Sequence, residues 1–379
     1  MDETVPKVVG LARIAFDARS LTTTRRTGIE NSSANLLRAL AQGSWEHDLH
    51  FYFHHLNQSA VQLGLGHWKV RSYGGPAWFK MVVPFWLLRD RIDVMHLSSP
   101  VLPRTLPVKS ILTVHDIMWE IQPDYLDDDG LRFHRRVVTP SIKRAHHLVA
   151  VSENTKQDLK NIYGIPANRI SVVPHGVEAR FRPLADAGEE VRRLHNLDGE
   201  FLLFVGTIKP VKNLGRILQA YSSLRAQGLR EVLVIVGGDG WEHEAALRSY
   251  RDGPLSDGVR WLGFVPDEHL PSLYSAAKAL VAPSLYEGFG LPLLEAMACG
   301  CPVIASNVAS VPEVVGDAGM LVDPTDIDAI GDAIYRICCS EDWRMNLRGL
   351  SLERAAQFEW RRSAEKAIAV YDYVIGGGC

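Results

Sequence analysis

The chain has 379 residues, of which 46% are hydrophobic and 22% are charged, and its formal net charge is -3. This length exceeds one ordinary hydrophobic core, so we expect two domains, and the composition excludes a disordered protein. The small negative charge excludes nucleic-acid binding that is driven by overall charge.

The first half of the chain alternates short apolar runs with helical patterns. The apolar runs predict strands, and nearly continuous apolar character is typical of parallel strands buried on both faces. Ser152 is a good N-cap, and Gly164 ends the helix that it starts. The predicted elements are a helix at 28–43, strands at 50–55, 93–99, 110–116, 147–152 and 170–176, and a helix at 152–164.

The second half repeats this order after a proline-rich, charged stretch, Pro174–Glu190, that shows no clear period. The repeated strand–helix order predicts a doubly wound α/β architecture with functional sites at the carboxyl ends of the strands. The predicted elements are strands at 201–207, 232–238, 259–264, 279–284 and 302–306, and helices at 213–228, 291–300 and 360–377.

The first ten residues carry acids and lack a secretion-signal pattern, and the five cysteines include no C-x-x-C pair. We therefore expect reduced thiols in a cytoplasmic protein, without a disulfide framework or a zinc site. The longest apolar run, Met81–Leu88, is too short for a membrane-spanning helix. The surrounding aromatic and basic run, Trp78–Arg91, suits either a core helix or contact with the inner membrane surface.

Residues 285–300, LYEGFGLPLLEAMACG, place a Gly-Phe-Gly turn between a predicted strand and a predicted helix. The bare N–H groups of such a turn, with the helix N-terminus, favour an anion or a ring of hydroxyls. Glu287 lies at the turn and Glu295 lies inside the helix, and carboxylates accept paired sugar hydroxyls well. An exposed loop acid and an ordinary helix-face acid explain the same residues equally well from composition alone.

Three further positions are candidates because they follow predicted parallel strands or begin a helix. Lys209 and Lys212, in the loop after the strand at 201–205, can meet phosphate charge, although a solvated loop is the usual fate of lysine. His115 ends the strand at 110–116 and can contact a reacting group, or it is one structural histidine among 14. Gly28 begins the first helix, where a backbone amide can approach a ligand.

Two other motifs do not support a site. Asp127-x-Asp129 is similar to a metal–diphosphate motif, but it follows no apolar strand, which favours a surface loop. The glycines at 237–240 are similar to a dinucleotide turn, but they lack the full G-x-G-x-x-G and the later acid. We therefore predict no metal site.

Residues 285–324 resemble the signature region of the family 4 retaining glycosyltransferases, whose two acids have the spacing of Glu287 and Glu295. Looser matches in the same order make the resemblance span nearly the whole chain: TGIENSSANLL, TVHDI, VSENTKQDL, VPHGV, FVGTIKPVKNL and LGFVPDEHLPSLYSAA. The resemblance implies a GT-B fold, with two Rossmann-like doubly wound domains that face each other across a cleft. It places an acceptor-side domain at 1–178, a linker at 179–198, a nucleotide-sugar domain at 199–358 and a helix crossing back at 359–379.

The resemblance also implies roles in the domain at 199–358. Glu295 would accept hydrogen bonds from the nucleotide ribose, and Glu287 would hold the transferred sugar. Lys212 would neutralise the diphosphate. Backbone N–H groups for the sugar and the phosphate would come from Gly288, Phe289, Gly290 and Leu291.

The remaining implied roles involve the loop after the first strand of that domain and the first domain. Thr207 and Lys209 would lie near the donor, Gly28 would approach the diphosphate, and His115 would contact the sugar and the leaving phosphate. The chain departs from the family pattern at Val211, because many relatives carry arginine before the lysine at 212, and one cation of the diphosphate site is thus missing from its expected position. Lys209 would then be the substitute cation.

The segments VGTIKPVKN and VPDEHLPSLYSAA are similar to those of bacterial mannosyltransferases of polysaccharide and O-antigen assembly. The resemblance implies a retaining hexosyltransferase that uses GDP-mannose, with UDP-sugars left open, and that needs neither a metal nor another cofactor. The expected acceptor is a glycan or a lipid-linked oligosaccharide. Two alternatives stay open: a nucleotide-sugar isomerase on the same fold, and a non-catalytic subunit that binds a glycan or a partner.

Overall fold

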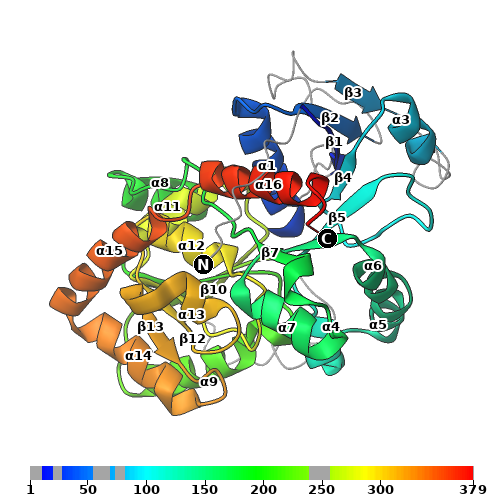
Figure 1. Cartoon of the computed structure of the whole chain (residues 1–379). Helices are drawn as coiled ribbons and strands as arrows, with labels where there is room; N and C mark the ends of the chain where they lie inside the picture. The colour runs from blue at the N-terminus through cyan, green and yellow to red at the C-terminus, as the bar shows by residue number, and fades with distance from the viewer. Residues whose placement is uncertain (1–10, 20–27, 54–68, 73–81, 239–256, 379) are drawn as a thin grey trace, which may run out of the picture. The chain divides into compact units, whose positions relative to one another are not determined.

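The computed structural model describes residues 11–19, 28–53, 69–72, 82–238 and 257–378. The chain forms two compact units. The first unit comprises Met1–Gly176 together with Glu359–Cys379, and the second comprises Val177–Phe358. The chain therefore passes between the units twice, and its carboxyl-terminal helix belongs to the first unit (Figure 1).

The first unit is built on a seven-stranded parallel sheet with the order β3-β2-β1-β4-β5-β6-β7. All five strands predicted in this half are present, whereas β1 and the short edge strand β3 were not predicted. The strands are β1 (Arg13–Asp17), β2 (Asp48–Phe53), β3 (Lys69–Ser72), β4 (Val94–Leu97), β5 (Lys109–Val114), β6 (His147–Ala150) and β7 (Ile170–Val172).

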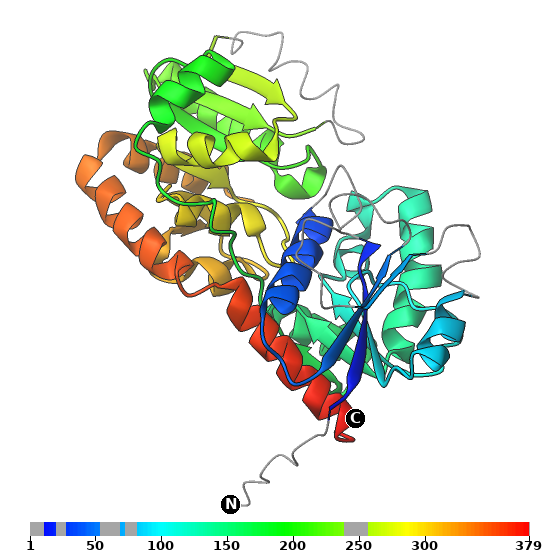
Figure 2. The same cartoon turned by 90° about the horizontal axis from the view of Figure 1, so that it is seen from above.

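Helices cover both faces of this sheet. Successive side chains along a strand point to opposite faces, so each strand contributes to two apolar cores. Ile14 and Phe16 of β1 contact the core formed with α1 and α16, and Ala15 between them contacts the core formed with α3 and α6. Both views show α16 beside α1 (Figures 1 and 2). The helices are α1 (Gly28–Gln42), α3 (Val83–Arg89), α4 (Met118–Ile121), η3 (Pro123–Tyr125), α5 (Asp128–Phe133), η4 (His134–Val138), α6 (Thr139–Arg144), α7 (Glu153–Tyr163), η5 (Ala167–Arg169) and α16 (Trp360–Ile375).

Local capping sets the ends of α7 as the sequence predicts. The Ser152 hydroxyl accepts a hydrogen bond from the N–H of Thr155 at 3.1 Å, and Gly164 adopts a left-handed conformation with φ 66°. Asp127 likewise caps α5, because its carboxylate accepts from the N–H of Gly130 at 2.5 Å. Asp129 pairs with Arg132, so this acidic segment has a structural role in the helix.

The aromatic and basic run includes α3, and residues 78–81 of the run lie outside the described residues. Val83 and Leu87 are buried in the core, whereas Phe85 is 60% exposed and Leu88 is 63% exposed. The helix therefore has a core-facing side and an apolar exposed side, and contact of that exposed side with a membrane surface stays a prediction. Within the described ranges, no helix has the length and apolar character that crossing a membrane requires.

The second unit repeats the architecture with a six-stranded parallel sheet in the order β10-β9-β8-β11-β12-β13. All five predicted strands are present, and only the three-residue edge strand β13 was missed. The strands are β8 (Phe201–Val205), β9 (Val232–Val236), β10 (Val259–Gly263), β11 (Ala279–Ala282), β12 (Val303–Ser306) and β13 (Met320–Val322).

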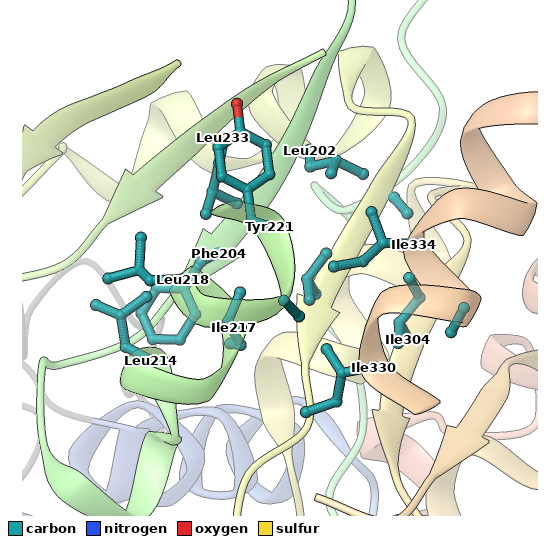
Figure 3. Close-up of a cluster of buried hydrophobic side chains, with 14 of the residues drawn as sticks. Leu202, Phe204, Leu214, Ile217, Leu218, Tyr221, Leu233, Ile304, Ile330 and Ile334 are labelled. Atoms are coloured by element: carbon teal, nitrogen blue, oxygen red, sulfur yellow. The ribbon is translucent and has the colours of Figure 1, made fainter. Parts of the chain in front are cut away.

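The core of the second unit packs helices α9 and α14 against this sheet. Figure 3 shows Ile217 and Tyr221 of α9 and Ile330 of α14 directed toward the strands that carry Phe204 and Ile304. The helices are α8 (Ala187–His195), η6 (Pro210–Lys212), α9 (Leu214–Ala226), η7 (Asp267–His269), α11 (Leu270–Ala276), α12 (Leu291–Ala298), α13 (Val311–Val315), η8 (Gly316–Ala318), α14 (Ile327–Cys339) and α15 (Glu341–Ala355).

The stretch 179–198 differs from the linker that the sequence suggests. It contains α8, which packs on α11 and belongs to the second unit. Only Ala187 and Val191 of α8 are buried, so its apolar periodicity is too short to identify the helix from the sequence.

Candidate active site

The candidate residues of the second unit, except Glu295 in α12, lie on two neighbouring connections between a strand and a helix. Thr207, Lys209 and Lys212 follow β8, and the turn at 287–291 follows β11. Strands β8 and β11 are hydrogen-bonded neighbours and run parallel, so their carboxyl ends lie at the same edge of the sheet. This is the edge at which open α/β sheets bind ligands.

Lys212 and Glu287 form an ion pair between these loops. The Lys212 Nζ lies 2.5 Å from the Glu287 Oε1, and the Ser284 hydroxyl donates to the same oxygen at 2.7 Å. The side chains of Lys212 and Glu287 are 21% and 16% exposed. One carboxylate oxygen is thus fixed by two donors, in a site that remains open to solvent.

Asn213 joins three loops of this edge. Its side-chain Nδ2 donates to the carbonyl oxygens of Pro283 at 2.9 Å and Pro324 at 2.6 Å. The residue is 4% exposed and adopts a left-handed conformation with φ 62°. The N–H of Leu285 also donates to the carbonyl of Val211 at 2.8 Å, so backbone and side-chain bonds together fix the two loops against each other.

The turn at 288–290 presents backbone donors at the start of α12. The N–H groups of Gly288 and Gly290 make no hydrogen bond within the described residues, and Gly290 has φ 95°. The Ser310 hydroxyl donates to the carbonyl of Glu287 at 2.8 Å, which fixes the start of the turn. Together with the helix N-terminus, these free donors suit an anion or sugar hydroxyls.

Glu295 lies in α12 beside a buried tyrosine. The Tyr274 hydroxyl donates to the Glu295 Oε2 at 3.1 Å. Burial raises the pKa of Glu295 to about 8, although the Tyr274 hydrogen bond and the charge of Arg180 act in the opposite direction. The uncomplexed carboxyl is therefore mostly protonated at neutral pH.

We predict that Glu295→Gln flattens the pH dependence of folding stability between pH 5 and 9. The folded pKa of about 8 exceeds the ordinary value of 4.5, so the folded protein binds more protons in this interval. The carboxyl's contribution to stability is complete below the unfolded pKa and falls as pH rises through 8. Urea titrations at several pH values should show the wild type losing about 2–4 kcal/mol more than the variant. Parallel curves for the two proteins would contradict the raised pKa.

The side chain of Val211 points into the protein interior and is only 6% exposed. Valine supplies no charge here, so Lys209 and Lys212 are the cations of this loop. Lys209 and Thr207 are both exposed, and Lys209 forms no ion pair with the described residues.

Two glycines bring the turns after β8 and β9 into contact. A Cβ atom on Gly237, which has φ 154°, would lie 1.8 Å from the carbonyl oxygen of Gly206. The N–H of Ile208 also donates to the carbonyl of Gly238 at 3.2 Å. The glycine at 237 therefore serves close backbone packing, and residues 239–240 of the motif lie outside the described residues.

His115 lies in the first unit, just beyond the carboxyl end of β5. Its Nε2 lies 3.4 Å from the carbonyl of Ser98, and the hydroxyl of Thr155 donates to its backbone carbonyl at 3.2 Å. Burial lowers the pKa of His115 to about 4, against the opposing effects of Ser98 and Glu30. A carbonyl only accepts, so Nε2 carries the hydrogen and the neutral ring presents Nδ1 as an acceptor.

Gly28 is the first residue of α1, and a Cβ atom there would have no atom of the described residues within 4 Å. If the glycine serves the approach of a ligand, Gly28→Ala should weaken nucleotide-sugar binding about tenfold while the melting temperature stays within about 2 °C of wild type. Calorimetric titration with the nucleotide-sugar and thermal unfolding measure the two effects. Unchanged affinity would show that the backbone at 28 does not contact the donor.

A hollow of about 600 Å³ lies at the amino ends of the strands of the second sheet, and the candidate loops lie at the opposite, carboxyl ends. Its lining includes Glu200 and Glu231, which precede β8 and β9 respectively, and the α14 residues Tyr335 and Cys339. None of the candidate residues lines it. Pocket size alone therefore does not identify the site in this chain.

Comparison with protein families divides the chain in two. Residues 189–349 match the model of glycosyl transferases group 1, and residues 26–181 match the model of glycosyltransferase family 4. The chain is 37% identical over 290 residues to the O-antigen chain mannosyltransferase B of Escherichia coli, with 76% of each chain covered. The chain belongs to the family 4 glycosyltransferases.

A second relative of this glycosyltransferase is the serotype-specific mannosyltransferase WbdA of Escherichia coli, which is 30% identical over 272 residues. The match covers 69% of this chain but only 33% of WbdA. Among solved structures, the sucrose-phosphate synthase of Thermosynechococcus elongatus has a TM-score of 0.73 at 22% identity, covering 96% of this chain and 99% of that one. This chain therefore has the two-domain, Rossmann-like GT-B fold of the glycosyltransferases.

The structure adds residues that the sequence did not single out. Asn213, Ser284 and Ser310 hold the loops that carry Lys212 and Glu287. Sequence patterns could not identify Asn213 and Ser310, because their partners become neighbours only when the sheet forms.

Proposed function

We propose that this glycosyltransferase moves mannose from GDP-mannose to a hydroxyl of a growing, lipid-linked glycan, with retention of anomeric configuration. The observation that carries the proposal is the Lys212–Glu287 ion pair beside the free N–H groups of the turn before α12. The names of the two mannosyltransferase relatives support the choice of mannose, and the name of the first supports an O-antigen glycan as acceptor.

The donor is expected to lie along the carboxyl edge of the second sheet, with its two ends recognised by different acids. Glu295 accepts from the ribose hydroxyls, and Glu287 accepts from hydroxyls of the transferred sugar. Lys212 and the N-terminus of α12 balance the diphosphate charge, assisted by Lys209. Phe264, which is 68% exposed just after β10, offers a ring on which the base can stack.

The chemical task is to stabilise positive charge on the sugar while the diphosphate leaves. Glu287 supplies negative charge near the sugar, and Lys212 and the turn stabilise the charge that develops on the leaving phosphate. A phosphate oxygen takes the proton of the attacking hydroxyl as it departs, so the new bond forms on the face that the diphosphate leaves. Transfer by this route needs no metal ion and should continue in EDTA.

His115 contributes as a neutral acceptor. Because its pKa is lowered to about 4 by burial, the ring carries no charge for the phosphate at neutral pH. Its Nδ1 can accept a hydrogen bond from a hydroxyl of the transferred sugar. This role is narrower than the contact with both sugar and phosphate that the resemblance implies.

A lipid-linked acceptor would bring the protein to a membrane surface, and α3 provides a suitable contact. Phe85 and Leu88 are exposed on this helix, and the guanidinium of Arg89 lies 4.4 Å from the centre of the Trp86 ring. Exposed apolar side chains beside a cation are typical of contact with the interfacial region of a membrane.

Calorimetric titration with GDP, UDP and ADP tests the donor class. We expect GDP to bind at least about tenfold more tightly than UDP, and preferential binding of UDP would contradict the choice of GDP-mannose. NMR spectroscopy of GDP-mannose incubated with the enzyme alone tests the isomerase alternative, which requires a new epimer. Failure to bind any of the nucleotides would favour the non-catalytic alternative.

A further inference from the structure

The two chain segments that connect the units, one at 176–177 and the other at 358–360, are in direct backbone contact. A Cβ atom on Gly176 would lie 2.2 Å from the backbone nitrogen of Trp360 and 2.6 Å from the carbonyl carbon of Glu359. One residue further along, the N–H of Val177 donates to the carbonyl of Phe358 at 3.0 Å. Only glycine at 176 allows the segments to approach so closely.

The rings of Trp360, His175 and His115 form a row from this backbone contact to the carboxyl end of β5. The His175 ring lies 5.5 Å from the Trp360 ring at 39°, and 5.5 Å from the His115 ring at 36°. His175 is 8% exposed. The hydroxyl of Ser363 in α16 donates to the carbonyl of Pro174 at 2.6 Å, which fixes the segment before His175.

His115 depends on such packing, because its own hydrogen bond is weak. The Nε2 contact with Ser98 is 3.4 Å long, beyond the usual range for an N–H donor and a carbonyl. A cavity of about 20 Å³, enough for about one water molecule, borders the rings of His115, His175 and Trp360. Without the His175 ring, the His115 ring would have space in which to move.

Helix α16 is also connected to β5 through a chain of hydrogen bonds. The Tyr371 hydroxyl lies 2.7 Å from the His96 Nδ1, and the His96 Nε2 lies 2.8 Å from the Thr113 Oγ1. Thr113 precedes His115 by two residues, and all three side chains of this chain of hydrogen bonds are buried. Helix α16 therefore fixes the strand through Tyr371, while its first residue, Trp360, reaches the candidate histidine through His175.

We propose that His175 and Trp360 are positioning residues for His115, so that the carboxyl-terminal helix holds the candidate histidine in place for sugar transfer. The proposal rests on the proposed function, in which His115 contacts the transferred sugar. The contact between the two connecting segments would then support the candidate site directly, through the ring of His175. A small displacement of His115 would be costly, because about 1 Å of misplacement can lower a rate about 100-fold.

The test compares Trp360 with a matched contact on the same helix. The Tyr373 ring lies 5.5 Å from the ring of His147, which begins β6 at the other edge of the sheet. Trp360→Leu should lower kcat about tenfold or more with the donor KM within about threefold, and Trp360→Phe should restore most of the rate. Tyr373→Leu should leave kcat within about twofold of wild type. Equal kcat in the two leucine variants would overturn the proposal.

NMR titration of His115 gives a readout that does not depend on turnover. Burial lowers the pKa of this ring to about 4, and loss of the covering rings in Trp360→Leu or His175→Leu should raise it toward 6.5. Tyr373→Leu should leave it unchanged. If wild type transfers no sugar while these shifts occur, the proposed function fails and the ring contact stands. If wild type transfers sugar and the pKa of His115 is the same in every variant, the positioning role fails.

Discussion

Replacing Glu287 with glutamine is expected to lower kcat for sugar transfer about 10²–10³-fold. Glutamine keeps the size of the side chain and a hydrogen bond with Ser284, but it removes the negative charge beside Lys212. That charge is needed in the transition state, when positive charge develops on the sugar, so the loss should fall on kcat more than on the donor KM. Steady-state kinetics with saturating acceptor measure the two constants.

The chain provides a matched control for this variant. Glu231 also pairs with a lysine, Lys278, at 2.5 Å, and it is 11% exposed, close to the 16% of Glu287. Glu231 precedes β9, at the amino ends of the strands of the same sheet, whereas Glu287 follows β11 at the carboxyl ends. Glu231→Gln should destabilise the fold as much as Glu287→Gln and leave kcat near that of wild type. Equal kcat values in the two variants would show that Glu287 serves stability alone.

Replacing Lys212 with methionine is expected to weaken GDP binding about 10–100-fold. Hydrogen bonds to charged groups contribute about 1.5–3 kcal/mol, which corresponds to this range of affinity. The Lys212 ammonium lies beside the turn whose Gly288 and Gly290 N–H groups bond to none of the described residues, so diphosphate would meet both kinds of donor. Calorimetric titration with GDP at low and moderate salt measures the effect.

Two lysines provide the comparison for Lys212. Lys278→Met removes an ammonium that pairs with Glu200 and Glu231 at the amino ends of the strands, and it should leave GDP affinity unchanged. Lys209→Met should weaken binding less than Lys212→Met, because Lys209 is exposed and its charge is screened by solvent. A loss of affinity in Lys209→Met that exceeds the loss in Lys212→Met would make Lys209 the main diphosphate cation.

Much of the fold is predictable because buried parallel strands read as apolar runs. Ten of the strands, including β9 with its sequence VLVIV, were predicted from such runs. The strands that were missed are short or mixed in character, such as the three-residue β13. Helix α8 was missed because only two of its side chains are buried, which leaves no periodic pattern to detect.

The candidate site was predictable only in part. The motif spacing placed Lys212 and Glu287 on loops after two apolar strands, and the sheet brings these strands side by side. The contacts of Asn213 with Pro283 and Pro324 span 70 and 111 residues, so no local pattern encodes them. The neutrality of His115 likewise results from burial in the folded unit, which composition does not show.

The most direct test of the proposed function is transfer from GDP-mannose in the presence of EDTA, with NMR analysis of the product. The acceptor is a mannose-terminated oligosaccharide on a lipid-like carrier. We predict a mannosyl product that keeps the anomeric configuration of the donor, formed at a rate that EDTA does not change. An inverted linkage, or a rate that depends on added magnesium or manganese, would contradict the proposed mechanism.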